Sequence, residues 1–300
     1  MSLGADGKPS GANWLDDRPV VVVGAAGQLG RTMVASLATA WRTVGLTRTD
    51  LDVSDAAAVH EVMARHQPLA IVNCAGYNQV DRAEVDPVAA LEANAFAVLT
   101  LSRAATVCGA ALVHFSSDFV FNGETDRPYV EDDRPEPQST YAASKLLGEW
   151  FAAGTPAHYV LRVESLFGGA ARRKSSMDRI IDAIMTGGPA KVFVDRVVSP
   201  SYVWDVTAAT AAILRNRPPV GLYHCVNTGA ATWHDLAVEV RRQSGIEATL
   251  EPIRMSDVSL PAARPRYCAM SNDKLRRAGI EMPTWQDSVG RALAERRTNP

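Results

Sequence analysis

The chain has 300 residues, of which 47% are hydrophobic and 21% charged, and its formal net charge at pH 7 is −2. This length suffices for a large hydrophobic core in one large domain or two smaller ones. The near-balanced charge argues against a broad surface for nucleic acid or for an anionic membrane. Four widely spaced cysteines form no CxxC pair and no metal-ligand spacing: Cys74, Cys108, Cys225 and Cys268. We therefore expect reduced thiols, no metal site and a cytoplasmic protein.

The first residues are predicted to be a flexible tail. Residues 1–17 are polar and glycine-rich, and they lack the basic end and apolar stretch of a signal peptide. No apolar run approaches the roughly 18 residues that a membrane-spanning helix needs. The sequence therefore predicts no membrane partner.

A glycine-rich loop follows the first predicted strand. The valine run at residues 19–23 stops at a glycine, as a buried parallel strand would, and residues 31–40 have a helical pattern. Between them, Gly24, Gly27 and Gly30 allow a tight turn and close approach of a ligand to the backbone. The free N–H groups of a helix N-terminus suit a pyrophosphate. This stretch predicts a dinucleotide-binding loop.

The second predicted strand, residues 43–48, bears on the choice of dinucleotide. An acidic residue at its end would hold the ribose 2′-hydroxyl of NAD(H), but the strand ends in Arg48. An arginine suits a 2′-phosphate, so NADP(H) is favoured. NAD(H) is the alternative, because an arginine in a loop is usually a solvated surface residue. Asp52 and Val53 are expected near the adenine.

Strands and helices then alternate, which predicts an α/β fold with a Rossmann-type doubly wound parallel sheet. Small residues after the strand at 69–73 would let a cofactor lie against its end, namely Cys74, Ala75 and Gly76. The other expected elements are a helix at 54–66 capped by Ser54 or Asp55, a helix at 88–108 carrying Asn94, and a strand at 111–115.

The most informative pair is Tyr141 and Lys145, inside the helical run 137–150. Residues four apart on a helix lie one turn apart on the same face. An ammonium beside a phenol stabilises the phenolate, so we expect Lys145 to lower the pKa of Tyr141. Such a pair can give a proton to a carbonyl oxygen or take one from an alcohol.

Beyond residue 168 the alternation becomes irregular, and a smaller, discontinuous C-terminal substrate lobe is predicted. The expected elements are helices at 177–185 and 202–215, strands at 191–194 and 221–226, and a helix capped by Thr232. We assign residues 18–168 and 201–226 to the NAD(P)-binding domain, and residues 169–200 and 227–296 to the substrate lobe.

From about Val20 to Leu293 the chain resembles the extended short-chain dehydrogenase/reductases, and within them the dTDP-4-dehydrorhamnose reductase family. GxxGxxG is the form of the glycine loop seen in that superfamily. The matching segments are Gly24–Gly30, Ile71–Tyr77, Val80–Glu84, Phe115–Phe121, Pro137–Glu149, Val160–Arg162, Ser199–Tyr202 with Asp205, and Arg264-Pro265 followed by Met270–Leu275.

The resemblance implies an NADPH-dependent reductase of a nucleotide-activated 4-keto-6-deoxysugar. Tyr141 takes the proton-donor place, Lys145 supports it and contacts the nicotinamide ribose, and Ser117 takes the hydroxyl place, with Ser116 as its competitor. The implied cofactor-binding residues are Gly24, Gly27, Gln28, Leu29, Gly30, Arg48, Asp52, Val53, Cys74, Ala75, Gly76, Tyr77, Asn94, Tyr141 and Lys145. The implied substrate-binding residues are Ser117, Asp118, Phe119, Glu164, Ser165 and Arg264. Asn94 could instead make only a local helix contact.

The substrate end departs from the family pattern. Phe119 replaces a tyrosine, and Val163-Glu-Ser165 replaces Thr-Ser-Trp, which removes a stacking surface and adds a carboxylate. The basic segment 171–176 could bind a diphosphate or be an exposed loop. Two alternatives stay open, namely reduction of a different carbonyl substrate and a non-catalytic NADP-binding role like that of the regulatory β subunit of methionine adenosyltransferase. A homodimer is a further expectation.

Overall fold

The computed structural model describes residues 17–169 and 175–298. Nearly all of the expected N-terminal tail and most of the basic segment 171–176 lie outside these residues. Six parallel strands form the central sheet in the order β10-β5-β4-β3-β1-β2. Their bounds are β1 (Val20–Val23), β2 (Thr43–Leu46), β3 (Ala70–Asn73), β4 (Ala111–Ser117), β5 (His158–Val163) and β10 (Gly221–His224).

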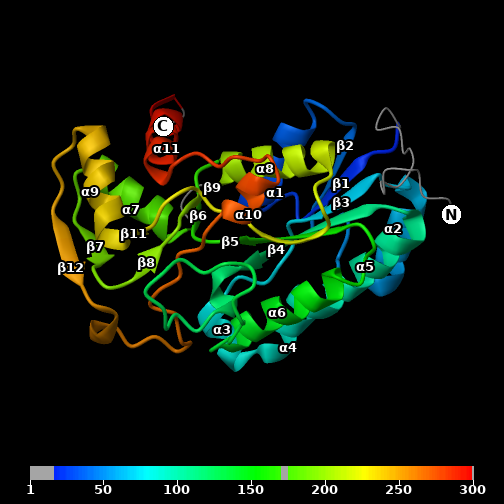
Figure 1. Ribbon diagram of the computed structural model, residues 1–300, viewed down its shortest axis with the longest axis horizontal. Coiled ribbons are helices and arrows are strands. Elements are labelled where there is room, and N and C mark those ends of the chain that lie inside the picture. Colours follow the sequence, from blue (N-terminus) through cyan, green and yellow to red (C-terminus); the bar gives the residue numbers. More distant parts are fainter. Residues whose placement is uncertain (1–16, 170–174, 299–300) are drawn as a thin grey trace.

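Helices cover both faces of this sheet (Figure 1). Successive side chains of a strand point to opposite faces, and β1 illustrates this alternation. Its Val20 and Val22 belong to one buried core, and Val21 and Val23 belong to another. The first core includes α1 (Gln28–Leu37) and α8 (Val203–Asn216), and the second includes α2 (Ala56–His66) and α5 (Ala97–Cys108), with α6 (Thr140–Ala152) on the same side. The predicted doubly wound α/β fold is confirmed.

Two helix starts are set by their capping residues. The predicted helix at 31–40 begins three residues earlier, at Gln28, because Gly27 is already its extended N-cap residue. Asp55 caps α2 by accepting a hydrogen bond from the backbone N–H of Ala58, which resolves the choice between Ser54 and Asp55.

The helix expected at 88–108 is a composite of three segments. It runs through α4 (Pro87–Leu91), a π-helical stretch η1 (Glu92–Phe96) and α5. Its 22 residues have a mean hydropathy of 1.2, so among the described residues it is one helix long and apolar enough to span a bilayer. The expectation that no stretch reaches that length is therefore corrected. Half of the apolar window is buried inside the protein, as in a core helix of a folded domain.

The C-terminal half builds a separate hydrophobic core beside the sheet, at the left of Figure 1. We call it the C-terminal lobe; it comprises α7 (Ser176–Met185), β7 (Ala190–Phe193), α9 (Trp233–Ser244), β12 (Leu250–Ile253) and α11 (Trp285–Thr298). Thr232 caps α9, as predicted. The remaining elements are short: α3 (Val80–Val85), η2 (Asp118–Val120), β6 (Leu166–Phe167), β8 (Val197–Val198), β9 (Ser201–Tyr202), β11 (Ala231–Thr232), η3 (Met255–Asp257) and α10 (Asp273–Arg277).

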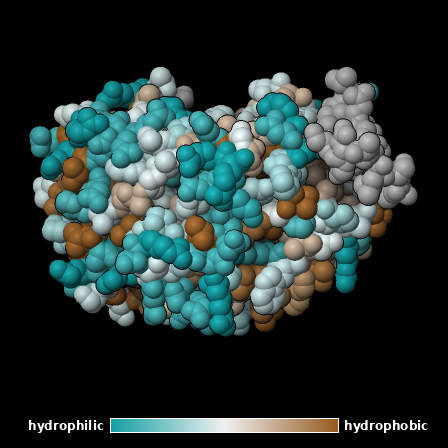
Figure 2. Space-filling view, viewed as in Figure 1, coloured by the Kyte–Doolittle hydropathy of each residue, from teal (hydrophilic) through white to brown (hydrophobic). Residues whose placement is uncertain are grey.

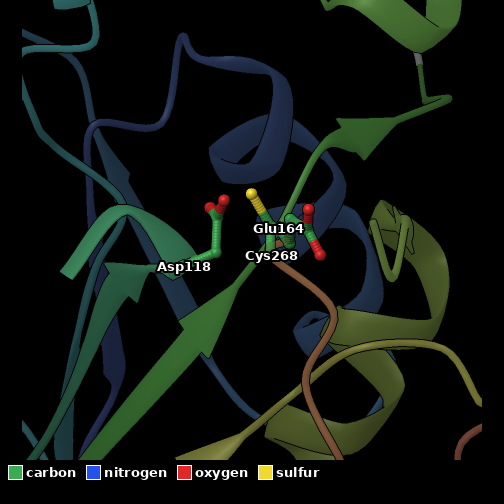
Figure 3. A group of neighbouring side chains, drawn as sticks. All are labelled: Asp118, Glu164 and Cys268. Atoms are coloured by element: carbon green, nitrogen blue, oxygen red, sulfur yellow. The ribbon is translucent and has the colours of Figure 1, made fainter. Parts of the chain in front are cut away.

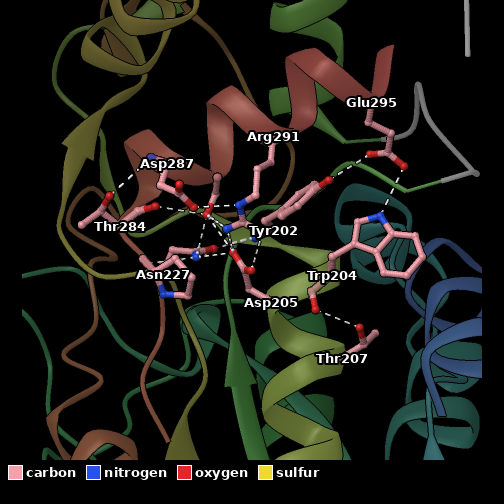
Figure 4. Close-up of polar contacts among 11 residues, drawn as sticks. Tyr202, Trp204, Asp205, Thr207, Asn227, Thr284, Asp287, Arg291 and Glu295 are labelled. Carbon is pink, nitrogen blue, oxygen red and sulfur yellow. Dashed lines mark hydrogen bonds and ion pairs between the residues drawn. The ribbon is translucent and has the colours of Figure 1, made fainter. Parts of the chain in front are cut away.

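A polar joint ties the C-terminal lobe to the sheet domain (Figure 4). Asp205, in the first turn of α8, accepts hydrogen bonds from the side chains of Asn227, Ser288 and Arg291. Both terminal nitrogens of Arg291 reach this carboxylate, at 2.7 and 2.8 Å. The joint fixes α11 against α8 with charge-assisted bonds of fixed direction.

The outer surface seen in Figure 2 is mostly hydrophilic, and hydrophobic residues appear on it singly or in small groups. Scattered apolar residues of this kind are normal on a folded domain.

Candidate active site

The glycine loop lies at the point where the order of the strands reverses. The chain passes from β1 to β2 on one side and returns to β3 on the other, and ligands of open α/β sheets bind at such a switch point. Gly24 has a φ of +77°, and a Cβ there would lie 2.5 Å from the backbone nitrogen of Ala75. A Cβ on Gly30 would lie 2.2 Å from the carbonyl oxygen of Gly24. Only glycine fits these two positions, so the loop is closely packed against the end of β3.

The start of α1 is open to a ligand. Its N-cap residue Gly27 has no side chain to satisfy the first N–H groups. The side chain of Gln28 points elsewhere, because its amide donates to the carbonyl oxygen of Gly168 and to Asp178. Gln28 thus links the loop to the C-terminal lobe, and Leu29 is buried in the core.

At the end of β2, Arg48 is exposed and the nearby carboxylates are already engaged. Asp50 accepts hydrogen bonds from the backbone and hydroxyl of Thr47. Asp52 accepts two from Ser54, which lower its carboxyl pKa, and lies 3.6 Å from the guanidinium of Arg48. The Arg48 side chain is 90% exposed, so its charge is available at this edge of the sheet.

Asn94 holds the loop after β3 in place. Its side-chain oxygen accepts from the backbone N–H of Tyr77, and its amide donates to the carbonyl oxygen of Tyr77 and to the hydroxyl of Ser144. The π-helical stretch that carries Asn94 packs so closely on α6 that a Cβ on Gly148 would lie 2.2 Å from the Asn94 carbonyl oxygen. Asn94 therefore joins the Cys74–Tyr77 loop to the helix of Tyr141.

Tyr141 and Lys145 are both buried on the face of α6 that packs against β4. Ser139 caps this helix by accepting from the N–H of Ala142. The ammonium of Lys145 donates to the carbonyl oxygen of Phe115 at 2.5 Å. Burial lowers the pKa of Lys145 to about 8, and the carboxylate of Glu149 acts in the opposite direction.

The predicted lowering of the Tyr141 pKa is wrong for this arrangement. Burial raises the pKa of the Tyr141 phenol, and the negative charge of Asp118 raises it further. Ser117 opposes the rise through hydrogen bonding. The phenol consequently stays protonated at neutral pH.

The two candidate hydroxyls point to different partners. Ser117 donates to Asp118 at 2.8 Å, accepts from the N–H of Phe119 and acts on Tyr141. Ser116 donates to Glu149, which lies one turn beyond Lys145 on α6. The geometry brings Ser117, and not Ser116, to the phenol.

Behind these side chains, Glu149 and Arg162 form a buried ion pair. Their side chains are 8% and 2% exposed, and two guanidinium nitrogens reach the carboxylate at 2.8 and 2.7 Å. The pair, with Ser116, connects α6 to β4 and β5. We call Glu149, Arg162 and Ser116 the strut.

At the substrate end, Glu164 is buried beside Asp118 and Cys268 (Figure 3). One ligand-type atom from each of the three lies within 4.8 Å of the others. One carboxylate oxygen of Glu164 accepts from the N–H of Ser199 at 2.5 Å. Ser165, next to it, has a left-handed φ of 46°, a strained conformation for serine.

Arg196 completes this cluster. Its guanidinium lies 3.6 Å from the sulfur of Cys268 and 5.5 Å from the centre of the Phe119 ring. Phe119 in turn meets the Tyr141 ring edge-on, with the centroids 5.6 Å apart. Burial raises the pKa of both Asp118 and Glu164, their mutual repulsion adds to the Glu164 shift, and Arg196 opposes both shifts.

The sequence reasoning missed Arg196 and Cys268. Their positions in the sequence could have indicated them. Arg196 stands just before the family-like Ser199–Tyr202 segment, and Cys268 stands just after Arg264-Pro265. Arg264 itself makes a bidentate ion pair with Asp81 of α3, with both distances 2.8 Å. It also donates to the carbonyl oxygen of Ala262.

Comparisons with known proteins show which proteins this chain is similar to. Residues 18–298 match the RmlD substrate binding domain. The chain is 33% identical over 269 residues to the dTDP-4-dehydrorhamnose reductase of Streptomyces griseus, covering 87% of this chain and 88% of that protein. It is 34% identical over 280 residues to a probable dTDP-4,6-dihydroxy-2-methyloxan-3-one 4-ketoreductase of Streptomyces antibioticus, covering 92% and 94%.

A solved structure gives the same result at the level of the fold. The dTDP-4-dehydrorhamnose reductase of Bacillus anthracis, in complex with NADP, superposes with a TM-score of 0.87 at 28% identity, covering 93% of this chain and 99% of that one. The chain belongs to the RmlD substrate binding domain family, within the extended short-chain dehydrogenase/reductases.

Proposed function

We propose that this protein is a cytoplasmic, NADPH-dependent reductase of a nucleotide-activated 4-keto-6-deoxysugar. The observation that carries the proposal is the placement of Tyr141, Lys145 and Ser117 together at the carboxyl edge of the sheet that also bears the glycine loop. The reductase names of the relatives from Streptomyces support the same reaction class.

The residues at the switch point fit a dinucleotide. Gly24 and Gly30 leave no room for a side chain, the first N–H groups of α1 are free for a pyrophosphate, and the buried hydroxyl of Tyr77 has no protein partner. Exposed Arg48 favours the 2′-phosphate of NADP(H) over NAD(H). When bound, the cofactor supplies the hydride, and the protein supplies orientation and the proton.

The chain's own groups have separate roles in this proposal. Tyr141 gives its proton to the substrate carbonyl oxygen, since its raised pKa keeps the phenol protonated at neutral pH. Ser117, whose single hydroxyl proton goes to Asp118 in this structure, turns that hydrogen bond to the same oxygen when substrate binds. Lys145 stabilises the phenolate that results and holds the nicotinamide ribose.

A second candidate keeps this chemistry and changes the sugar. Glu164, Ser165 and Phe119 depart from the family pattern at the substrate end, and one relative is named for a methyloxanone substrate and not for rhamnose. Asp118 and Arg264 complete the proposed substrate-binding residues. The exact sugar is therefore the open part of the proposal.

The test is NADPH oxidation by purified protein with a panel of dTDP-4-ketosugars. We expect the wild-type protein to turn over NADPH only when such a sugar is present. Tyr141→Phe and Ser117→Ala should each lower kcat by at least about 100-fold and leave NADPH binding unchanged. Tyr159→Phe is a matched control that removes a hydroxyl bonded to the carbonyl oxygen of Pro218, and it should keep most of the activity. An inert wild-type protein with every sugar would refute the proposal, and recovery of a stoichiometric protein partner would then favour a regulatory role.

A further inference from the structure

A buried carboxylate ties the start of the dinucleotide-binding helix to the C-terminal helix. Asp178, in the first turn of α7, is completely buried. It accepts hydrogen bonds from the side-chain amide of Gln28 on α1, the backbone N–H of Gly168 after β6 and the guanidinium of Arg296 on α11. We call Gln28, Asp178 and Arg296 the Asp178 link, because they join segments that are far apart in the sequence.

The two carboxylate oxygens of Asp178 serve different partners. Oδ2 lies 2.9 Å from the amide nitrogen of Gln28, and Oδ1 lies 2.5 Å from a guanidinium nitrogen of Arg296. Arg296 is only 6% exposed, and its Nε also donates to Asp182 at 3.1 Å. Hydrogen bonds to charged groups are roughly twice as strong as neutral ones, and these bonds are shielded from water. The position of the Gln28 side chain is therefore set by α11.

The loop after β6 fills the space between α11 and α1. Gly169 has a φ of +77°, and a Cβ there would lie 2.7 Å from the hydroxyl oxygen of Thr32 on α1. Its backbone N–H donates to Glu295 of α11 at 3.2 Å. The preceding carbonyl oxygen, that of Gly168, accepts from Gln28 at 2.8 Å. Because this loop contacts both helices closely, a displacement of α11 is passed on to the start of α1.

Gln28 can transmit this arrangement to a ligand. It is the first residue of α1, so its backbone N–H belongs to the groups at the helix N-terminus that suit a pyrophosphate. Its side-chain nitrogen has two hydrogens, and they are directed to Asp178 and to the Gly168 carbonyl. The side chain therefore positions the N–H groups and leaves contact with the dinucleotide to the backbone.

We propose that Asp178 and Arg296 are positioning residues of the dinucleotide site, and that NADP(H) binding and packing of α11 stabilise each other. Through Gln28, the buried carboxylate holds the first N–H groups of α1 where the pyrophosphate binds. A coupling between two sites is reciprocal, so the bound dinucleotide stabilises α11 in turn. The inference rests on the NADP(H) binding in the proposed function and is independent of the sugar.

The first test is Gln28→Met, which removes the amide and keeps the length of the side chain and a good helix former. We expect its Kd for NADPH, measured by fluorescence titration, to rise about fivefold or more, the lower end of typical coupling between sites. The KM for NADPH should rise with it. The kcat at saturating NADPH and the KM for the nucleotide sugar should stay unchanged, because only cofactor binding is affected.

Two neighbouring arginines of α11 provide a matched pair of variants. Arg296→Met breaks the Asp178 link and should weaken NADPH binding as Gln28→Met does. Arg297→Met removes an exposed guanidinium that donates to the carbonyl oxygen of Ser244, and it should leave NADPH binding unchanged. Arg296→Lys keeps the charge and should restore part of the affinity. In the double variant Gln28→Met/Arg296→Met the two losses should not add, since both changes break the same connection.

Hydrogen exchange tests the reverse direction in the wild-type protein, so it does not depend on a variant that fails to fold. Saturating NADPH should slow exchange of the backbone amides of α11 more than that of α9, which lies in the same lobe. Gln28→Met should remove most of this difference. Equal slowing of α9 and α11, wild-type NADPH affinity in Gln28→Met, or equal losses in Arg296→Met and Arg297→Met would overturn the inference. A wild-type protein that binds NADPH and reduces no ketosugar refutes the proposed function, and the exchange experiment still decides the inference.

Discussion

At the scale of single residues, the electrostatics of the site differ from the simple pairing of a tyrosine with a lysine. Their spacing on one helix face is correctly given by the sequence, but the pKa of Tyr141 depends on burial and on Asp118, which come from the tertiary structure. The group whose charge changes near working pH is Lys145, with a pKa of about 8.

This predicts an alkaline limb in the pH profile of reduction. As the pH rises through about 8, Lys145 loses the proton that lets it stabilise the phenolate. We therefore expect kcat/KM to be level below that pH and to fall about tenfold per pH unit well above it. Lys145→Arg keeps its charge at every pH, so its lower activity should lack this limb. A wild-type profile that stays level to about pH 9.5 would contradict the assignment.

At the scale of elements, the strut determines how α6 sits against β4 and β5. Glu149 receives hydrogen bonds from Ser116 of β4 and from Arg162 of β5, and the ring of Phe121 lies 4.8 Å from the Arg162 guanidinium carbon. The same helix carries Tyr141 and Lys145. Its position relative to Ser117 therefore depends on this buried pair.

Breaking one side of the strut should destabilise the protein strongly. Both side chains are almost fully buried. Glu149→Gln leaves the buried charge of Arg162 unpaired, and Arg162→Met leaves that of Glu149 unpaired. Each change should lower the free energy of unfolding by about 3–5 kcal/mol. Urea denaturation measures this loss. The double variant Glu149→Gln/Arg162→Met should be more stable than Glu149→Gln alone, and a loss equal to the sum of the two single losses would mean that the two residues act independently.

The elements themselves differ in how well the sequence predicts them. The valine runs and glycine loop define β1, α1 and the switch point, because local pattern and tertiary role agree there. The π-helical stretch at 92–96 has no signal in the local sequence, and its Asn94 packs against Gly148, a residue distant in sequence. Strand β12 was missed for a similar reason, as it pairs with β7 across about sixty residues of chain.

At the scale of the whole molecule, the substrate end is assembled where the two halves meet. Glu164 is one residue beyond β5, whereas Arg196 and Cys268 come from segments that the sequence places 32 and 104 residues away. No local pattern brings these three together, which explains why Glu164 could be predicted and its neighbours could not. The division into an NAD(P)-binding domain and a substrate lobe at residues 168, 200 and 226 stays a prediction.

Arg264 provides a test of how the C-terminal segment engages a substrate. Both of its terminal nitrogens donate to Asp81, so Arg264 must exchange this partner if it is to bind the diphosphate of the nucleotide sugar. Asp81 is 43% exposed, and solvent therefore limits the ion pair to less than about 1 kcal/mol. Asp81→Asn should accordingly lower the KM for the nucleotide sugar by up to about fivefold, because each 1.4 kcal/mol corresponds to a factor of ten.

Arg264→Ala should act in the opposite direction and raise that KM by at least about tenfold, through loss of a charge-assisted contact to the diphosphate. The KM for NADPH should be unchanged in both variants, and the double variant should behave like Arg264→Ala. Steady-state kinetics at two salt concentrations measure the KM values of the three variants for the nucleotide sugar and for NADPH. The change in KM caused by Asp81→Asn should be smaller at high salt. If Asp81→Asn raises the KM as Arg264→Ala does, Asp81 positions the arginine instead of competing for it, and the exchange does not occur.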